Sequence, residues 1–154
     1  MTALAALPEG IDVAASALAR GCDHLLSLQH PRGYWKGELE TNVTMEAEDL
    51  LLRQFLGIRG ERETRETAAW IRSRQRADGS FAVYHGGPPE LSTTIEGWVA
   101  LRLAGDPPDA LHMRRAAELV RDQGGIEASR VFTRIWMALF GLWPWERLPA
   151  LRPS

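Results

Sequence analysis

Apolar residues recur every three or four positions along most of the chain, and short segments that contain glycine or proline separate the runs. This period places apolar side chains on one face of an α-helix. It predicts helices at about residues 11–29, 42–56, 62–76, 92–104, 110–123 and 130–140. No segment alternates apolar and polar residues as a strand would, so the predicted fold class is all-α. A surface loop is predicted at residues 81–91, where two glycines precede two prolines.

Polar residues predict how several of these helices begin. Thr93 and Glu96 have the spacing of a capping box, in which Glu96 would bond the backbone at the start of the fourth helix. Asp109 and Ser129 are predicted to cap the fifth and sixth helices, because short polar side chains accept hydrogen bonds from free amides at helix starts.

The start of the second helix, residues 41–48, carries two carboxylates into an apolar run. Glu46 and Glu48 are two residues apart, so they cannot share a face of the helix. Glu48 is predicted to point inward and Glu46 toward solvent. A carboxylate that faces a core needs an ion pair or hydrogen bonds, so Glu48 is expected to find a partner elsewhere in the chain.

A short signature recurs along the chain. Its two clear copies are Gln29, Gly33 and Trp35 and, 46 residues later, Gln75, Gly79 and Phe81. A weaker third copy lacks the aromatic residue and starts 48 residues after the second, at Gln123-Gly124-Gly125. We expect the glutamine amide to bind backbone groups at neighbouring helix ends, while glycine permits the turn and the aromatic ring covers it. This is a structural role and not a catalytic one.

Helix pairs that repeat every 40 to 50 residues or so cannot bury their apolar faces alone and must stack on one another. They curve into a superhelix or close into an α/α barrel, whose inner ring would hold the helices at 42–56, 92–104 and 130–140. Three repeats are too few to close a ring. The prediction is therefore an incomplete barrel over residues 41–154, preceded by a helix and loop in residues 1–40. Uncovered apolar faces would favour self-association.

Composition excludes several classes of function. The net charge is −2 and the Lys and Arg residues are scattered, which argues against nucleic-acid binding. The four histidines show no metal-ligand spacing. The single Cys22 indicates a reducing compartment, and residues 1–10 lack the basic start of a secretory signal, so a cytoplasmic location is predicted. The longest uncharged apolar run has 11 residues, fewer than the roughly 20 that a membrane-spanning helix needs.

Together these motifs resemble the squalene–hopene cyclases and related class II triterpene cyclases, whose QW motifs have the form Gln-x-x-x-Gly-x-aromatic. The resemblance covers about residues 11–151 and concerns the N-terminal region of the bacterial enzymes. Beyond the QW repeats it rests on segments in the family's order and spacing, which are residues 33–35, 42–48, 86–89, 92–96, 123–125 and 130–136.

The resemblance implies an enzyme of two α/α barrels that attaches to one membrane leaflet and cyclises squalene or a similar polyprenoid without a metal or other cofactor. An Asp-x-Asp-Asp motif would protonate the terminal alkene, and aromatic side chains would stabilise the cation. A polar, water-bearing end of the cavity would then take the last proton or add water. By resemblance, Glu48, Glu96, Arg130 and Trp136 belong to this terminating end.

The residues themselves leave alternatives open. Glu48, Glu96 and Arg130 lie in the first two turns of successive inner helices, so a barrel would bring them together at one end. Such a Glu–Arg–Glu cluster could hold a water molecule and tune its basicity. Glu96 could instead serve only the capping box, and Glu48 with Arg130 could form a purely structural ion pair. Trp136 could line the cavity or belong to the core.

The acid that would start such a reaction is missing from this sequence. Its aspartates, at positions 12, 23, 49, 78, 106, 109 and 122, never form Asp-x-Asp-Asp. We therefore expect the N-terminal part of a cyclase, with no proton-donating residue and no activity alone. One alternative is one half of a split cyclase, in which a second chain supplies the missing region. Another is a non-catalytic helical-repeat scaffold. A prenyltransferase subunit is disfavoured because no Asp/Cys/His zinc set is present.

Overall fold

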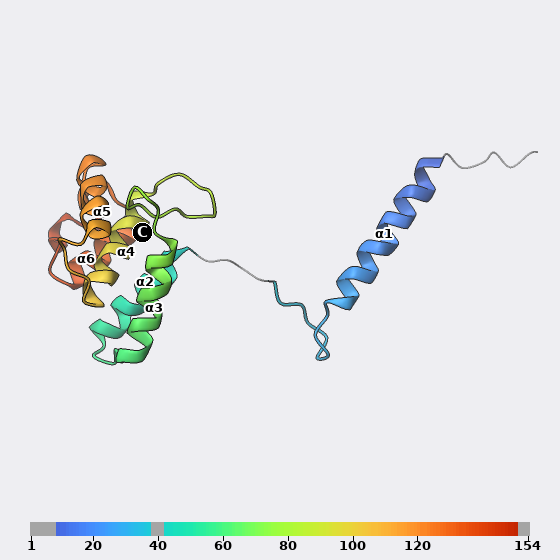
Figure 1. The fold of residues 1–154 in the computed structure, drawn as a ribbon, viewed down its shortest axis with the longest axis horizontal. Coiled ribbons are helices and arrows are strands. Elements are labelled where there is room, and N and C mark those ends of the chain that lie inside the picture. Colours follow the sequence, from blue (N-terminus) through green and yellow to red (C-terminus); the bar gives the residue numbers. More distant parts are fainter. Residues whose placement is uncertain (1–8, 38–41, 151–154) are drawn as a thin grey trace, which may run out of the picture. The chain divides into compact units, whose positions relative to one another are not determined.

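The computed structural model describes residues 9–37 and 42–150, which form helices joined by turns and loops (Figure 1). The α-helices are α1 (Glu9–Ser27), α2 (Val43–Phe55), α3 (Glu61–Arg74), α4 (Leu91–Leu103), α5 (Leu111–Asp122) and α6 (Val131–Leu139). Two short 3-10 helices, η1 (Ile126–Ala128) and η2 (Trp145–Arg147), were not predicted from the sequence. Neither described range contains a strand, which confirms the all-α fold class.

The chain divides into two compact units, residues 1–39 and 40–154. The described part of the first unit is α1 and the turn after it, which is the first copy of the repeat. There the Gln29 amide donates to the Gly33 carbonyl at 3.0 Å, and the Trp35 indole donates to the Leu25 carbonyl at 2.6 Å. The turn therefore folds back on the end of α1. Large apolar side chains of α1 are exposed, among them Leu18.

Helix α4 is the centre of the second unit. It contacts α2, α3, α5 and α6, and Figure 1 shows it between α2 and α3 on one side and α5 and α6 on the other. Nine of its 13 residues are buried, including six consecutive ones, so the helix is covered on all sides. One apolar cluster joins it to α2, α3 and α5, through Val43, Ala47, Leu50, Ala68, Ile71, Phe81, Ala100, Leu101 and Met113. A second cluster joins it to α2 and α6, through Leu51, Ile95, Val99 and Met137.

The second copy of the repeat ties three helices together. The Gln75 amide donates to the Gly79 carbonyl at 2.8 Å and to the His112 carbonyl in α5 at 3.1 Å. Phe81 is fully buried and packs so closely on Gly97 of α4 that a Cβ atom there would lie 2.8 Å from its ring. The motif that ends α3 thus also contacts α4 and α5.

The third copy is shorter. Gln123 is the C-cap of α5, and Gly124 and Gly125 follow it with φ angles of +94° and +67°. The chain turns there directly into η1.

The predicted capping box at the start of α4 is wrong. The helix begins at Leu91, and its N-cap is Glu90, whose carboxylate accepts a hydrogen bond from the Thr93 amide at 2.6 Å. The Thr93 side chain is buried and its hydroxyl lies 3.3 Å from that of Thr44 in α2. Because helix packing uses this hydroxyl, the longer Glu90 side chain caps the helix instead.

The predicted caps of α5 and α6 are also wrong. Ala110 is the N-cap residue of α5, since a turn closed by the hydrogen bond from its amide to the Pro107 carbonyl moves the helix start past Asp109. The Ser129 hydroxyl donates to the Ile126 carbonyl at 2.7 Å and so closes η1. Helix α6 begins one residue later than predicted, without a side-chain cap.

Candidate functional site

A cavity of about 510 Å³ lies between α2, α4 and α6. It has a polar side, formed by side chains from all three helix starts, and an apolar side formed by α6. Its lining residues are Thr44, Glu48, Glu96, Arg130, Phe132, Ile135, Trp136 and Leu139. The four residues that the sequence assigns to one site, Glu48, Glu96, Arg130 and Trp136, therefore all line one cavity.

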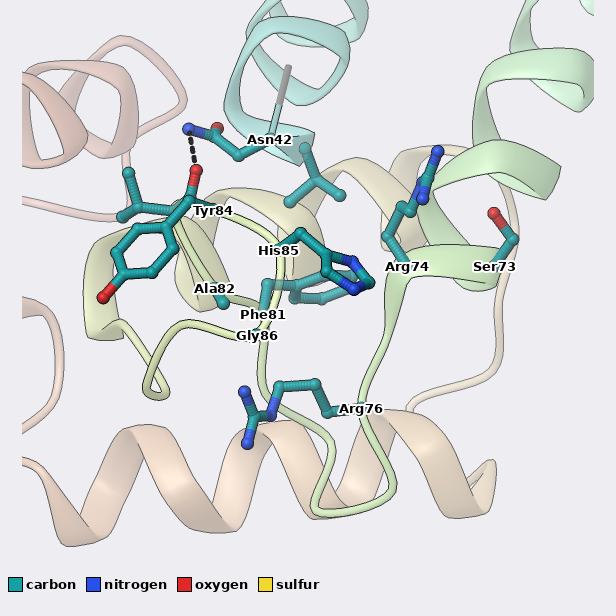
Figure 2. A pocket seen from close by; sticks show the side chains of 11 residues that line it. Asn42, Ser73, Arg74, Arg76, Phe81, Ala82, Tyr84, His85 and Gly86 are labelled. Carbon is teal, nitrogen blue, oxygen red and sulfur yellow. Dashed lines mark hydrogen bonds between the residues drawn. The ribbon is translucent and has the colours of Figure 1, made fainter. Parts of the chain in front are cut away.

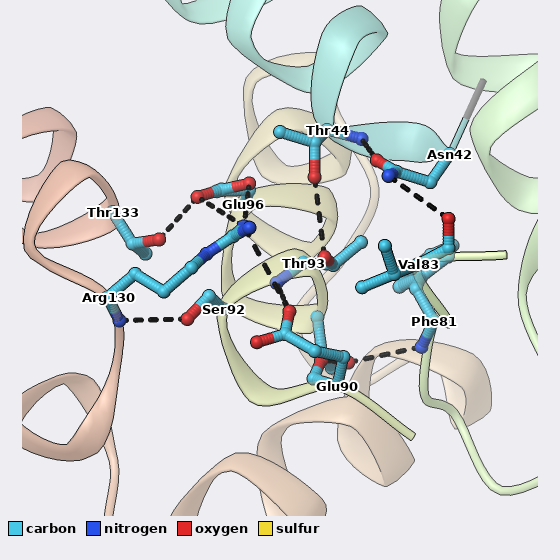
Figure 3. A network of polar contacts seen from close by, with 11 residues as sticks. Asn42, Thr44, Phe81, Val83, Glu90, Ser92, Thr93, Glu96, Arg130 and Thr133 are labelled. Carbon is cyan, nitrogen blue, oxygen red and sulfur yellow. Dashed lines mark hydrogen bonds and ion pairs between the residues drawn. The ribbon is translucent and has the colours of Figure 1, made fainter. Parts of the chain in front are cut away.

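Glu96 is the most deeply buried ionisable group of this cavity, with its side chain 1% exposed. It lies in the second turn of α4, facing α6, because the helix begins five residues before it. The Thr133 hydroxyl donates to its Oε1 atom (Figure 3). The Arg130 guanidinium lies 3.4 Å from Oε1 and 3.3 Å from Oε2. Glu96 is thus held by Thr133 of α6 and by Arg130, the residue just before that helix, and the capping-box alternative is wrong.

Arg130 precedes α6 and is held by the first turn of α4. Its backbone amide donates to the Ser92 hydroxyl at 2.9 Å. Its guanidinium lies 3.3 Å from Glu96 and 4.0 Å from a second carboxylate, that of Glu90 (Figure 3). The arginine therefore sits between a buried and a partly exposed carboxylate of the same helix.

Glu48 lines the same cavity from α2, where it is half-buried. In the part of the chain that the structure describes, the ion pairs of Arg130 go to Glu90 and Glu96, so the predicted pair with Glu48 is not formed. Glu46, predicted to face solvent, is half-buried. Trp136 lines the cavity and also packs on the cluster around Met137, so both of its predicted locations apply.

The two carboxylates beside Arg130 differ in acidity. Burial raises the pKa of Glu96, and the charge of Glu48 raises it further, while the Thr133 hydrogen bond and the Arg130 charge oppose the rise. Burial also acts on Glu90, but the hydrogen bond from Thr93 and the Arg130 charge outweigh it and lower the pKa of Glu90. Glu96 is therefore the better proton acceptor of the two, since an acceptor works best when its pKa approaches the working pH.

Sequence reasoning missed four residues around Glu96 and Arg130, which are Thr44, Glu90, Ser92 and Thr133. Thr133 follows Arg130 by three residues, a spacing that puts both side chains on one face of a helix. That signal was available. Glu90 and Ser92 had no comparable signal, because their position depends on where α4 begins.

Other cavities of the second unit have a different character. One of about 300 Å³ lies beside the loop at residues 81–86 and includes Arg76 and His85 (Figure 2). The Asn42 amide donates there to the Val83 carbonyl at 3.2 Å, and Arg76 donates to the Gly87 carbonyl, so these donors hold the loop. Another, of about 370 Å³ between α4, α5 and α6, is lined mainly by apolar side chains.

Within residues 9–37 and 42–150, no three His, Cys, Asp or Glu side chains gather as metal ligands would. None of the helices described has both the length and the apolar character that crossing a membrane requires.

Comparison with known proteins connects this site to a family. The family model of the squalene-hopene cyclase N-terminal domain matches residues 18–153. The squalene–hopene cyclase of Alicyclobacillus acidocaldarius is 46% identical over 140 residues, which are 91% of this chain and 22% of that protein. The dammaradiene synthase of Dryopteris crassirhizoma is 39% identical over 137 residues, 89% of this chain and 20% of that protein. The squalene–hopene cyclase of Zymomonas mobilis is 39% identical over 128 residues, with coverages of 82% and 20%.

These relatives are much longer than the sequence compared with them, and the chain spans about a fifth of the length of each. The matched residues include all three copies of the repeat and every residue that lines the cavity. The chain belongs to the squalene–hopene cyclase N-terminal domain family.

Proposed function

We propose that this chain forms the polar, terminating end of a cavity in which a squalene-like polyprenoid is cyclised. The observation that carries the proposal is the position of Glu96. This carboxylate is fully buried at the head of a cavity with an apolar wall, is paired with Arg130, and has a raised pKa. A buried carboxylate with a counter-ion and an apolar wall suits a reaction whose last intermediate is a hydrocarbon cation.

The last step of such a reaction needs a base near the cation. In one outcome a C–H bond next to the cation breaks, its electron pair forms the alkene, and the proton passes to a water or to Glu96. In the other outcome water forms a C–O bond to the cation and releases a proton to Glu96. The charge of Arg130 favours the ionised form of Glu96, which is the form that accepts a proton, and Glu48 offers a second carboxylate in the same cavity. The face of Trp136 would attract the cation by its quadrupole.

The acid that starts the reaction must come from outside these 154 residues, because Asp-x-Asp-Asp does not occur in the sequence. The partner of this region is then a further cyclase region, in the same polypeptide or in a second chain. On this proposal the chain works in the cytoplasm, as part of a protein attached to one membrane leaflet.

The proposal is tested by grafting. This chain would replace the matching N-terminal region of the 46% identical Alicyclobacillus enzyme, and the chimera would be incubated with squalene and its products separated by gas chromatography. We expect cyclic products, and we expect Glu96→Gln to change the ratio of alkene to alcohol or to slow turnover. Glu118→Gln, on the exposed face of α5, is the matched control. A chimera that cyclises squalene equally well with Gln at position 96 would refute the assignment.

The chain alone provides a second test. Incubated with squalene, it should give no cyclic product, and a cyclic product would show that the starting acid lies within it. A chimera that folds but never cyclises squalene would favour the non-catalytic scaffold.

A further inference from the structure

The starts of α4 and α6 are joined by polar contacts that converge on one ion pair. Glu90, Ser92 and Glu96 come from the first two turns of α4 and its N-cap, and Arg130 and Thr133 from the start of α6. The side chains of Glu90, Arg130, Glu96 and Thr133 are linked in that order, and the Ser92 hydroxyl accepts from the Arg130 backbone amide (Figure 3). The pair Glu96–Arg130 therefore has a neighbour on each side.

Thr133 is the neighbour on the buried side. It is fully buried, and its hydroxyl donates to Oε1 of Glu96. A threonine in a helix can instead donate to a carbonyl of the preceding turn, so this choice of acceptor is specific to the site. Oε1 of Glu96 thus contacts both Thr133 and Arg130, while Oε2 lies 3.3 Å from Arg130. A hydrogen bond from the Thr44 side chain of α2 also favours the ionised carboxylate and so opposes the rise in the pKa of Glu96.

Glu90 is the neighbour on the more exposed side. Its side chain is 29% exposed, compared with 1% for Glu96. Its Oε2 atom accepts the Thr93 amide at 2.6 Å, which fixes the carboxylate, and lies 4.0 Å from the Arg130 guanidinium. Arg130 is 47% exposed and has a long, flexible side chain, so it would turn toward solvent without a restraint on that side.

We propose that Thr133 and Glu90 are positioning residues for the Glu96–Arg130 pair: Thr133 occupies one oxygen of Glu96 from the buried side, and Glu90 restrains Arg130 from the exposed side. The inference rests on the proposed function, in which Glu96 accepts the last proton. Neither residue lines the cavity, so both act through Glu96 and Arg130.

The test reads the acidity of Glu96 in this chain, without substrate. The pH titration of the glutamate carboxyl carbons is followed by carbon-13 NMR, and the Glu96 signal is identified as the one that Glu96→Gln removes. Thr133→Val removes the hydroxyl at nearly constant volume. It should raise the pKa of Glu96 by about one to two units, because a hydrogen bond to an ionised group favours that form. Thr133→Ser keeps the hydroxyl and should restore the pKa.

Thr64→Val is the matched control for Thr133→Val. Thr64 is also a buried threonine, but its hydroxyl donates to the Gly60 carbonyl at 2.5 Å, away from the site. It should lower thermal stability and leave the pKa of Glu96 unchanged. If Thr133→Val likewise leaves that pKa unchanged, or Thr133→Ser fails to restore it, Thr133 has only a packing role.

Glu90→Gln tests whether Glu90 affects the pKa of Glu96 by restraining Arg130 or only through its own negative charge. The amide oxygen can still cap α4, but the ion pair with Arg130 is lost. If Glu90 restrains Arg130, the pKa of Glu96 rises by less than about one unit, since exposed ion pairs are weak. If Glu90 is only a nearby negative charge, the pKa of Glu96 falls. If it is only a helix cap, Glu90→Gln leaves the pKa unchanged. A fall or no change would overturn the role of Glu90.

These measurements do not depend on cyclisation, so the two proposals fail separately. A pKa that responds to Thr133→Val and Glu90→Gln, with an unchanged product ratio for Glu96→Gln in the chimera, would keep the positioning residues and refute the proposed function. An unresponsive pKa with a changed product ratio would do the opposite.

Discussion

Replacing Gly79 with alanine tests whether the turn in the second copy of the repeat, residues 75–81, which we call the QW turn, is held by direct packing on the backbone of α5. Gly79 has a φ angle of +87°, in the left-handed region that glycine adopts freely. An added Cβ atom would lie 2.5 Å from the backbone nitrogen of Ala116 and 2.6 Å from the Cβ atom of Arg115, both in α5. Neither atom belongs to the flexible end of a side chain, so the turn and α5 would have to move apart.

The magnitude has two parts. An alanine in the left-handed region costs roughly 1–2 kcal/mol relative to glycine. Forcing a methyl group into a packed site costs a further amount of about 1–3 kcal/mol. Gly105→Ala is the matched control, because Gly105 has a φ angle of +100° and no atom within 4 Å of its added Cβ. It should show the first part alone.

The assay is urea unfolding of the wild type and both variants, followed by circular dichroism. We expect Gly79→Ala to lower the free energy of unfolding by about 1–3 kcal/mol more than Gly105→Ala does. Equal losses for the two variants would refute the reasoning, because they would mean that the turn and α5 separate without cost.

Three other predictions concern pH and association. Hydrogen bonding from Arg72 lowers the pKa of Asp106, so ionised Asp106 stabilises the fold fully above the ordinary aspartate range, and this stabilisation is lost as pH falls through the lowered pKa. Asp106→Asn should therefore flatten the acid side of a plot of unfolding free energy against pH, whereas Asp109→Asn, at an exposed position, should not. Burial raises the pKa of Glu96, so its contribution to the free energy of unfolding is complete below the ordinary glutamate range and is lost as pH rises through the raised pKa. Glu96→Gln should remove this loss of stability at higher pH. A stability–pH curve that Glu96→Gln leaves unchanged would contradict the raised pKa. Exposed apolar side chains should make the chain self-associate and bind a hydrophobic dye, and a monomer at high concentration that binds none would contradict this.

The helices could be predicted because their apolar period is strong and because glycine or proline follows most of them. Their starts could not be predicted as well. At residues 92–94 three hydroxyl side chains compete for the role of cap, and tertiary packing decides among them. Thr93 is buried and lies beside α2, so the cap falls to Glu90, a residue type that local propensity ranks below threonine.

The sequence predicted which helix starts form the candidate site, but it did not predict which carboxylates pair with Arg130. The repeat indicates that the starts of α2, α4 and α6 meet, and Glu48, Glu96 and Arg130 do line one cavity. Which carboxylate the arginine selects depends on ångström-level distances that no sequence period contains. The shift in the start of α4 brings Glu90 within 4.0 Å of Arg130, and so replaces the predicted pair with Glu48.

The QW turn and the polar site are mechanically connected, although they serve different purposes. The Phe81 amide donates to the Thr94 hydroxyl at 3.1 Å, and the Phe81 carbonyl accepts the Glu90 amide at 2.9 Å. The same residue that packs its ring on Gly97 thus fixes the N-cap and the first turn of α4 through its backbone. Because Glu90 and Glu96 project from that start, a structural repeat sets the position of both carboxylates that flank the arginine. The second copy of the repeat therefore aligns the site as well as joining the helices.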